Sequence, residues 1–229
     1  MTCNAGNRKA MAEPTGDTAV PPDGRAPAAA ARGRRETRRD GHRGSGPGEG
    51  RERGMSVELG IFVERDGEPA VQLERAVPAG VQEVWQALTE PGRMAAWFPS
   101  PTVHLEPTVG GRVDFAGDPY AEDHSGTVLE FDAPHRLSYT WGDDELLFRL
   151  TRRGEGCVLA LTDVLESRSA AARNAAGWDV CLDELVKLLS GGTPSGPHDG
   201  TATDWRERYD AYVAAGMPSG APVPGGDPG

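Results

Sequence analysis

Cysteine is scarce in this chain of 229 residues, which contains only Cys3, Cys157 and Cys181. An odd number at wide spacing indicates neither a disulfide framework nor a zinc site. Cys157 and Cys181 stand among apolar residues and are interpreted as small core residues. This cysteine usage is typical of a reducing compartment, so we expect a cytoplasmic protein.

Long apolar runs are also lacking. No segment approaches the ~20 apolar residues that a membrane-spanning helix needs, so membrane insertion is not expected. The basic stretch near the N-terminus is not followed by the apolar core of a secretory signal.

Catalytic and cofactor motifs are missing as well. Gly110 and Gly111 stand between expected strands and lack the GxGxxG spacing, and the sequence has no HExxH, CxxC or nucleophile-elbow pattern. The histidines are scattered. His104 could serve a pocket as acid or base, but a surface position is favoured. We therefore expect no cofactor, no metal site and no evident catalysis.

Positive charge is concentrated at the N-terminus. Residues 1–54 hold 11 Lys/Arg and 7 Asp/Glu and almost no large apolar side chain, which predicts a disordered leader of charge about +4. Its arginine run at 32–40 suits a nucleic-acid or membrane-surface tail. We favour an unstructured leader, or upstream sequence translated from an early start codon with Met55 as the true start. Residues 55–229 hold 13 Lys/Arg and 28 Asp/Glu, about −15, so no nucleic-acid partner is expected there.

The folded part begins with a strand and two short helices. Apolar residues alternate along 70–77, which predicts a strand ended by Pro78. Apolar residues then recur at the spacing of one helical face: Val81, Val84, Trp85 and Leu88. Pro91 ends this helix and can open a second one, whose apolar side carries Trp97 and Phe98.

Strand candidates separated by turn residues follow. They span 102–107, 112–117, 125–134, 135–144, 145–154 and 157–166. Because the links are short, consecutive strands are expected to be antiparallel neighbours in a meander.

Two further helices are predicted near the C-terminus. The longer one, at 169–191, carries Trp178 and several leucines on one face. After a Pro/Gly-rich linker at 193–200, residues 201–216 are expected to form a docking helix with an aromatic face of Trp205, Tyr209 and Tyr212. That face should dock on its own domain, which we favour, or on a partner chain. Residues 217–229 are predicted to be a disordered tail.

This order predicts an α+β helix-grip fold over residues 55–192. A curved antiparallel sheet of about six to seven strands would wrap around the long C-terminal helix, with two short helices after the first strand. A curved sheet covered by a single helix leaves space between the two layers, which predicts a ligand pocket. Trp85 and Trp97 would then seal one end of it.

Several stretches carry a resemblance to a known family: VPAGVQEVWQALTEPGRMAAWFPS at 77–100, VGGRVDF at 109–115 and GTVLEFDAPHRLSYTW at 126–141. They resemble the SRPBCC (START/Bet v 1-like) superfamily, and within it the group named after the C-terminal domain of the activator of Hsp90 ATPase. The resemblance covers about residues 70–190 and implies the fold rather than a function. Members often have histidine in a Leu-Thr-His run where this chain has Asp163. Residues 1–54 cannot form the separate N-terminal domain of the eukaryotic co-chaperone, so a chaperone-activating role is not implied.

Nine residues are expected to line the pocket: Trp85, Trp97, Phe98, Phe131, Tyr139, Trp141, Phe148, Asp163 and Trp178. A plain core would equally contain such aromatic residues. Tyr139 and Trp141 should face one side and offer a hydroxyl and an indole N–H to a mostly apolar ligand. Strand parity points Asp163 inward and Asp114 outward. Burial would raise the pKa of Asp163 and suit it as a general base, although a structural role is favoured.

Three functions stay open. We favour a non-enzymatic module that binds a small hydrophobic molecule. One alternative is a cyclase/aromatase-like enzyme acting on a hydrophobic substrate in the same cavity, which needs at least two convergent polar side chains. The other is a co-chaperone-like protein-partner module that uses the acidic surface and the aromatic face at 205–212.

Overall fold

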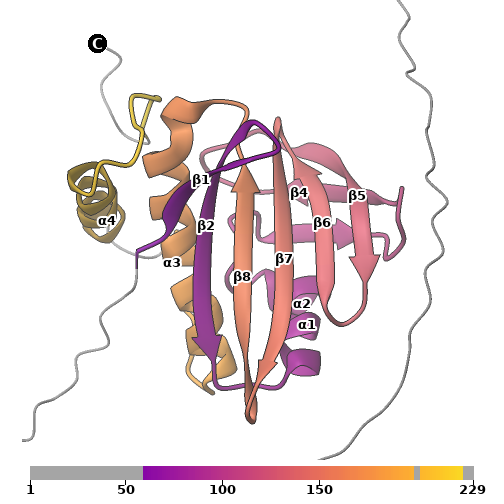
Figure 1. Ribbon diagram of the computed structural model, residues 1–229. Coiled ribbons are helices and arrows are strands. Elements are labelled where there is room, and N and C mark those ends of the chain that lie inside the picture. Colours follow the sequence, from indigo (N-terminus) through magenta and orange to yellow (C-terminus); the bar gives the residue numbers. More distant parts are fainter. Residues whose placement is uncertain (1–58, 199–201, 224–229) are drawn as a thin grey trace, which may run out of the picture. The chain divides into compact units, whose positions relative to one another are not determined.

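The computed structural model of this chain describes residues 59–198 and 202–223 (Figure 1). The leader expected at 1–54 and the start proposed at Met55 lie outside the described residues, as do 224–229 at the C-terminal end. Among the described helices, none combines the length and the apolar composition that crossing a bilayer requires.

One antiparallel sheet dominates the fold. Its strands are β1 (Ile61–Arg65), β2 (Glu68–Val77), β3 (Thr102–Leu105), β4 (Arg112–Ala116), β5 (His124–Asp132), β6 (Arg136–Trp141), β7 (Asp144–Arg153) and β8 (Gly156–Val164). Their spatial order is β1-β2-β8-β7-β6-β5-β4-β3, so strands β3 to β8 form the expected meander and β2 closes on β8. The α+β helix-grip fold is confirmed.

The sheet has eight strands, one or two more than expected. The additional strand is β1, which pairs with β2 through a tight turn at Asp66 and Gly67. Both turn residues have positive φ, 53° and 89°, as a two-residue hairpin requires. The alternation in IFVER is poor because the apolar Ile61, Phe62 and Val63 are consecutive, which obscures the strand in the sequence.

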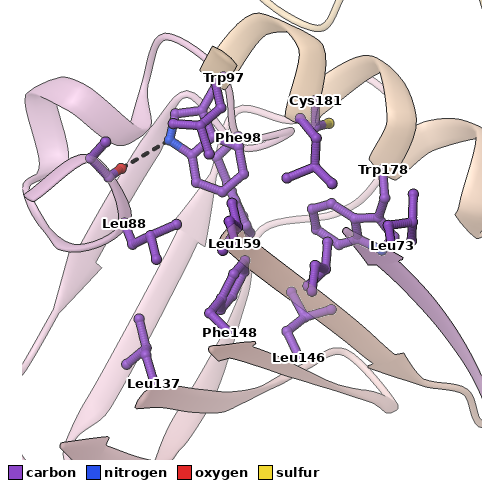
Figure 2. Packing of buried hydrophobic residues seen from close by; sticks show 14 of the residues in the cluster. Leu73, Leu88, Trp97, Phe98, Leu137, Leu146, Phe148, Leu159, Trp178 and Cys181 are labelled. Atoms are coloured by element: carbon purple, nitrogen blue, oxygen red, sulfur yellow. Dashed lines mark hydrogen bonds between the residues drawn. The ribbon is translucent and has the colours of Figure 1, made fainter. Parts of the chain in front are cut away.

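Two short helices follow β2. They are α1 (Val81–Thr89) and α2 (Pro91–Met94), on the same side of the sheet as the long helix α3 (Ala171–Leu189) (Figure 1). The indole of Trp97 donates to the backbone carbonyl of Ala87 at 2.9 Å (Figure 2). That carbonyl belongs to the last turn of α1, where no intrahelical donor is available. Trp97 therefore ties the chain after α2 to the end of α1.

The core lies between the sheet and α3. The apolar side chains in the first turns of α3 are the methyl groups of Ala171, Ala172, Ala175 and Ala176, all fully buried. Larger side chains follow along the same helix. Trp178 and Cys181 face sheet residues such as Leu73 and Leu159 (Figure 2). Burying one such large side chain contributes about 1.5–3 kcal/mol.

Helix α4 (Ala202–Ala214) packs on α3 through a buried polar cluster. Tyr212 donates its hydroxyl to Asp179 at 2.6 Å and accepts the backbone N–H of Gly60 at 2.8 Å. Arg75 of β2 forms an ion pair with the same carboxylate. The aromatic residues of α4 therefore meet their own domain, with Tyr212 completely buried and Trp205 and Tyr209 partly so.

The segment after α4 differs from the disordered tail expected at 217–229. Met217 is buried, Ala172 donates its backbone N–H to Pro218 at 2.9 Å, and Ala221 donates to Ser169 at 3.1 Å. The first N–H groups of a helix have no intrahelical acceptor, so the backbone N–H of Ala172 is available to the segment that follows α4. The paired residues are far apart in the sequence, so composition alone does not predict these contacts.

Candidate ligand-binding site

Seven of the nine expected lining residues meet in one aromatic cluster between α2, the sheet and α3. Phe98 is its centre, with ring-centroid distances of 5.5 Å to Trp97, 5.7 Å to Trp178 and 6.2 Å to Trp141. Tyr139 and Phe148 join at 5.8 Å from each other, and Trp97 lies 6.3 Å from Phe148. Asp163 is attached by a hydrogen bond from Trp178. Figure 2 shows the part of the cluster around Trp97, Phe98 and Phe148.

The other two expected residues, Trp85 and Phe131, pair with each other instead. Their rings meet edge to face at 5.2 Å, and neither makes a ring contact with the cluster around Phe98. A shift of register between Val128 and Glu130 changes the parity of β5, so that Phe131 as well as Val128 turns toward the core. Trp85 and Phe131 therefore form a separate pair beside α1.

Two residues that were not expected complete the cluster. Phe115 of β4 stacks on Phe98 at 5.7 Å, and the ring of His124, at the start of β5, lies 5.1 Å from Phe115 and 6.1 Å from Trp141. Strand parity could have identified His124, because it directly opposes the inward residue Phe115. His104, the histidine considered from the sequence, is exposed.

Four buried polar atoms of this cluster have no hydrogen-bond partner among the described residues. They are Tyr139 Oη, Trp141 Nε1, His124 Nε2 and Asp163 Oδ1. Buried polar groups in folded proteins nearly always have a partner. A fifth such atom, Arg208 Nη1, belongs to α4 and lies outside the cluster. The unpaired polar atoms of the domain are thus concentrated where its aromatic rings meet.

Three of these unpaired atoms can be assigned as hydrogen-bond donors or acceptors. His124 Nδ1 lies 3.0 Å from the carbonyl oxygen of Glu122, which can only accept, so Nδ1 carries a proton, and the tautomer with an unprotonated Nε2 presents that atom as an acceptor. Trp141 Nε1 is a donor. Burial raises the pKa of Tyr139 far above its usual range, so its hydroxyl stays protonated and can donate or accept.

Asp163 lies on the inner face of β8, completely buried, as its parity predicts. Its Oδ2 accepts the indole N–H of Trp178 at 2.9 Å and the amide of Asn174 at 3.0 Å. The same amide nitrogen donates to Asp144 Oδ2 at 2.9 Å, which places two carboxyl groups around one amide. Burial, with a smaller contribution from the neighbouring Asp144 carboxylate, raises the pKa of Asp163 to about 7. Asp114, in contrast, is half-exposed on the outer face.

Asp144 and Asn174 were not recognised from the sequence. They stand 30 residues apart, Asp144 at the start of β7 and Asn174 in α3, and meet only because the helix packs on the sheet. Asp144 is held in place by a hydrogen bond from the backbone N–H of Glu166, 2.8 Å from its Oδ1. Neither residue belongs to a motif, so no signal in the sequence marked the pair.

The aromatic rings fill much of the space between α3 and the sheet. One hollow of about 290 Å³ lies on the outer sheet face and is lined by residues such as Glu74, Leu147 and Arg149. Another, of about 320 Å³, lies between β1 and the end of α4, beside Ile61 and Met217. Neither is the pocket expected between helix and sheet. In the described part of the chain, no group of three or more His, Cys, Asp or Glu side chains is placed to hold a metal ion.

Comparison with known proteins places this domain. The family described as "Activator of Hsp90 ATPase homolog 1-like protein" matches residues 78–190. The crystal structure of CalU16 from Micromonospora echinospora is 25% identical, with a TM-score of 0.53, over 67% of this chain and 92% of that one. The solution structure of CalU16 agrees, with a TM-score of 0.55 at 25% identity over 67% of this chain and 90% of that one.

A conserved protein of unknown function from Enterococcus faecalis, EF2215, shares the fold. Its structure has a TM-score of 0.56 at 21% identity, over 68% of this chain and 89% of that one. No curated protein matches the sequence. From the family match and the helix-grip architecture together, the domain belongs to the activator of Hsp90 ATPase homolog 1-like family, within the SRPBCC superfamily.

Proposed function

We propose that this domain binds a small, mostly apolar molecule with polar substituents, without evident catalysis, in the aromatic cluster between α2, the sheet and α3. One observation carries the proposal: Tyr139, Trp141, His124 and Asp163 each bring a buried polar atom without a partner to this cluster. The aromatic rings supply the apolar walls, and these four atoms supply the polar contacts that orient a ligand.

The energetic argument rests on what an unpaired buried group costs. Leaving one buried donor or acceptor unsatisfied costs about 1–3 kcal/mol, so four of them in one cluster represent a considerable penalty. A ligand that carries hydroxyl or carbonyl groups on an apolar frame satisfies these atoms and removes that penalty. The free energy lost to unsatisfied groups in the free domain is thus regained on binding and contributes to the affinity for a molecule with matching polar groups.

A bound molecule has to separate rings that are in contact in the free domain. The segment best suited to move is α2, a single turn of four residues, together with the chain after it, which carries Trp97 and Phe98. Few polar contacts among the described residues join this segment to the rest of the domain: the hydrogen bond from Trp97 to Ala87, the ion pair of Arg93 with Glu83, and the contact of His198 with the Pro99 carbonyl. A shift of α2 relative to α1 would open the cluster, and the ligand selects that open state.

The aromatic face of α4 does not support a protein-partner module. Trp205 and Tyr209 stack on each other at 5.3 Å and pack against the core, and Tyr212 is buried against Asp179. The aromatic face, one of the two surfaces on which that alternative relied, is therefore partly covered by the domain itself.

A cyclase/aromatase-like enzyme is the second candidate, and a specific observation favours it. Asp163 and His124 both bring an unpaired titratable atom to the cluster, and Asp163 has a pKa of about 7. An acid and a base of this kind near one substrate suit proton-transfer chemistry. The discriminating measurement is the mass of a bound molecule before and after incubation with the protein. A binding module returns the molecule unchanged.

The proposal is tested by nuclear magnetic resonance of the tryptophan indole N–H groups during titration with 1-tetralone. Trp141 has a free indole N–H, whereas those of Trp97 and Trp178 are already bonded within the core. We expect the Trp141 signal, assigned with the variant Trp141→Phe, to move in a saturable manner while that of Trp205 in α4 stays fixed. A titration in which no core indole moves contradicts the proposal.

A further inference from the structure

The hydrogen bonds of Asp163 fix where its proton lies. Oδ2 accepts two N–H donors, Trp178 Nε1 at 2.9 Å and Asn174 Nδ2 at 3.0 Å, and Oδ1 has no partner. In a neutral carboxyl group, the oxygen that accepts two N–H bonds is the carbonyl oxygen. The proton of neutral Asp163 therefore sits on Oδ1, the oxygen that is free to contact a ligand.

The surroundings of Asp163 favour this neutral form. Its neighbours on the inner face of β2 and β7 are Val71 and Leu146, which offer no charge. The charged groups that act on it are the carboxylate of Asp144 and the guanidinium of Arg173. The Asp144 carboxylate opposes ionisation of Asp163, whereas Arg173 and the two N–H donors favour it. Desolvation outweighs the latter, because the side chain is completely buried.

We propose that Asp163 binds the ligand as a neutral carboxylic acid, donating its Oδ1 proton to a carbonyl oxygen of a molecule that carries a ketone or a related neutral acceptor. This inference rests on the proposed function and names the ligand class: an apolar ring compound with a carbonyl group, rather than a hydrocarbon or a cation. A cation would require the carboxylate instead, and a hydrocarbon would leave the O–H unpaired. Trp141 Nε1, the other fixed donor of the cluster, suits the same kind of oxygen.

The experiment compares two probes of nearly equal size, 1-tetralone and tetralin, which differ by one carbonyl oxygen. Both are titrated into the full chain at pH 6 and pH 8, and binding is followed through the indole signal of Trp141. At pH 6 we expect the ketone to bind about threefold to tenfold more tightly than the hydrocarbon. This ratio corresponds to the net free energy of one neutral hydrogen bond. At pH 8 the carboxyl group is mostly ionised and has no proton to donate, so the preference should shrink to what the Trp141 N–H alone provides.

The variant Asp163→Asn gives the decisive result. Its side-chain oxygen replaces Oδ2 as the acceptor for Trp178 and Asn174, which places its NH₂ group, a permanent donor, where Oδ1 was. We expect this variant to prefer the ketone equally at both pH values. The matched control is Asp114→Asn, a change on the outer face of β4, which should keep the pH dependence of the original protein.

The outcomes separate the two proposals. If both probes bind with equal affinity at pH 6, or if Asp163→Asn binds without preference for the ketone, the role of Asp163 is overturned while the binding site stands. If neither probe moves the Trp141 signal, the binding site itself fails, and the role of Asp163 with it.

Discussion

Trp178 donates its indole N–H to Asp163 at 2.9 Å, and this bond joins the long helix α3 to strand β8 inside the core. It fixes the orientation of the carboxyl group and of the indole ring that contacts Phe98. This pair of side chains thus connects the aromatic wall of the proposed site to its buried carboxyl group. The pH dependence of this domain should follow from that pair.

Replacing Asp163 with Asn should make the domain less sensitive to pH. The pKa of Asp163 is about 7 in the folded chain and near 4 in the unfolded one, so between these values the folded state holds a proton that the unfolded state has lost. Its stabilising contribution is therefore complete below pH 4 and is lost as the pH rises to 7. At pH 8 we expect Asp163→Asn to be about 2–4 kcal/mol more stable than the original protein, measured by urea unfolding.

The control for this measurement is Asp114→Asn, because the pKa of Asp114 is shifted in the opposite direction to that of Asp163. Hydrogen bonds from Ser125 and Arg112 lower the pKa of Asp114, so this group stabilises the fold at neutral pH and loses that effect in acid. Asp114→Asn should therefore gain no stability at pH 8. A loss of stability at pH 8 in Asp163→Asn would show that the carboxylate is favoured at this position, contrary to our account.

Replacing Trp97 with Phe should weaken the tie between α1 and the chain after α2. The change keeps a ring in the core but removes the donor that, among the described residues, bonds to the Ala87 carbonyl in the last turn of α1. We expect a loss of about 1–3 kcal/mol in the free energy of unfolding, together with faster hydrogen exchange in α1. Trp205→Phe in α4, whose indole N–H has no hydrogen bond in the described part, is the matched control and should cost less. Equal losses in the two variants would mean that ring volume, not the hydrogen bond, is what matters.

Replacing Tyr212 with Phe should loosen α4. The hydroxyl bridges Gly60 and Asp179, so its removal leaves a backbone N–H and a buried carboxylate oxygen each short of one partner. A cost of about 1–3 kcal/mol and increased hydrogen exchange along 202–214 are expected. Tyr209→Phe on the same helix loses a hydroxyl that makes no hydrogen bond in the described part and should be nearly neutral. Unchanged exchange in α4 of the Tyr212 variant would show that apolar packing alone holds the helix.

The sequence predicts the parts of this fold that depend on periodicity. Val113 and Phe115 point inward and Asp114 outward as their alternation requires, and Trp178 lies on the buried face of the long helix. The hairpin strand β1 is not predicted from the sequence, because three consecutive apolar residues hide its alternation. Phe131 is placed beside Trp85 by a bulge, which shifts the parity of β5 in a way that no residue pattern in the strand announces.

The site is less predictable than the fold. The inward direction of Asp163 follows from parity, but its surroundings do not, since the Asn174 amide that it shares with Asp144 comes from a helix distant in sequence. The docking of α4 likewise depends on a hydroxyl of Tyr212 meeting a carboxylate of Asp179, 33 residues earlier. Such contacts are set by how the layers come together, and a single sequence does not record that arrangement.

The most direct test of a bound small molecule is native mass spectrometry of the full chain purified from its own host. Our account predicts a constant mass added to the polypeptide, released on denaturation and diminished in Trp141→Phe but not in Trp205→Phe. A bare polypeptide mass, in a protein whose unfolding temperature is unaffected by 1-tetralone and tetralin alike, would contradict it.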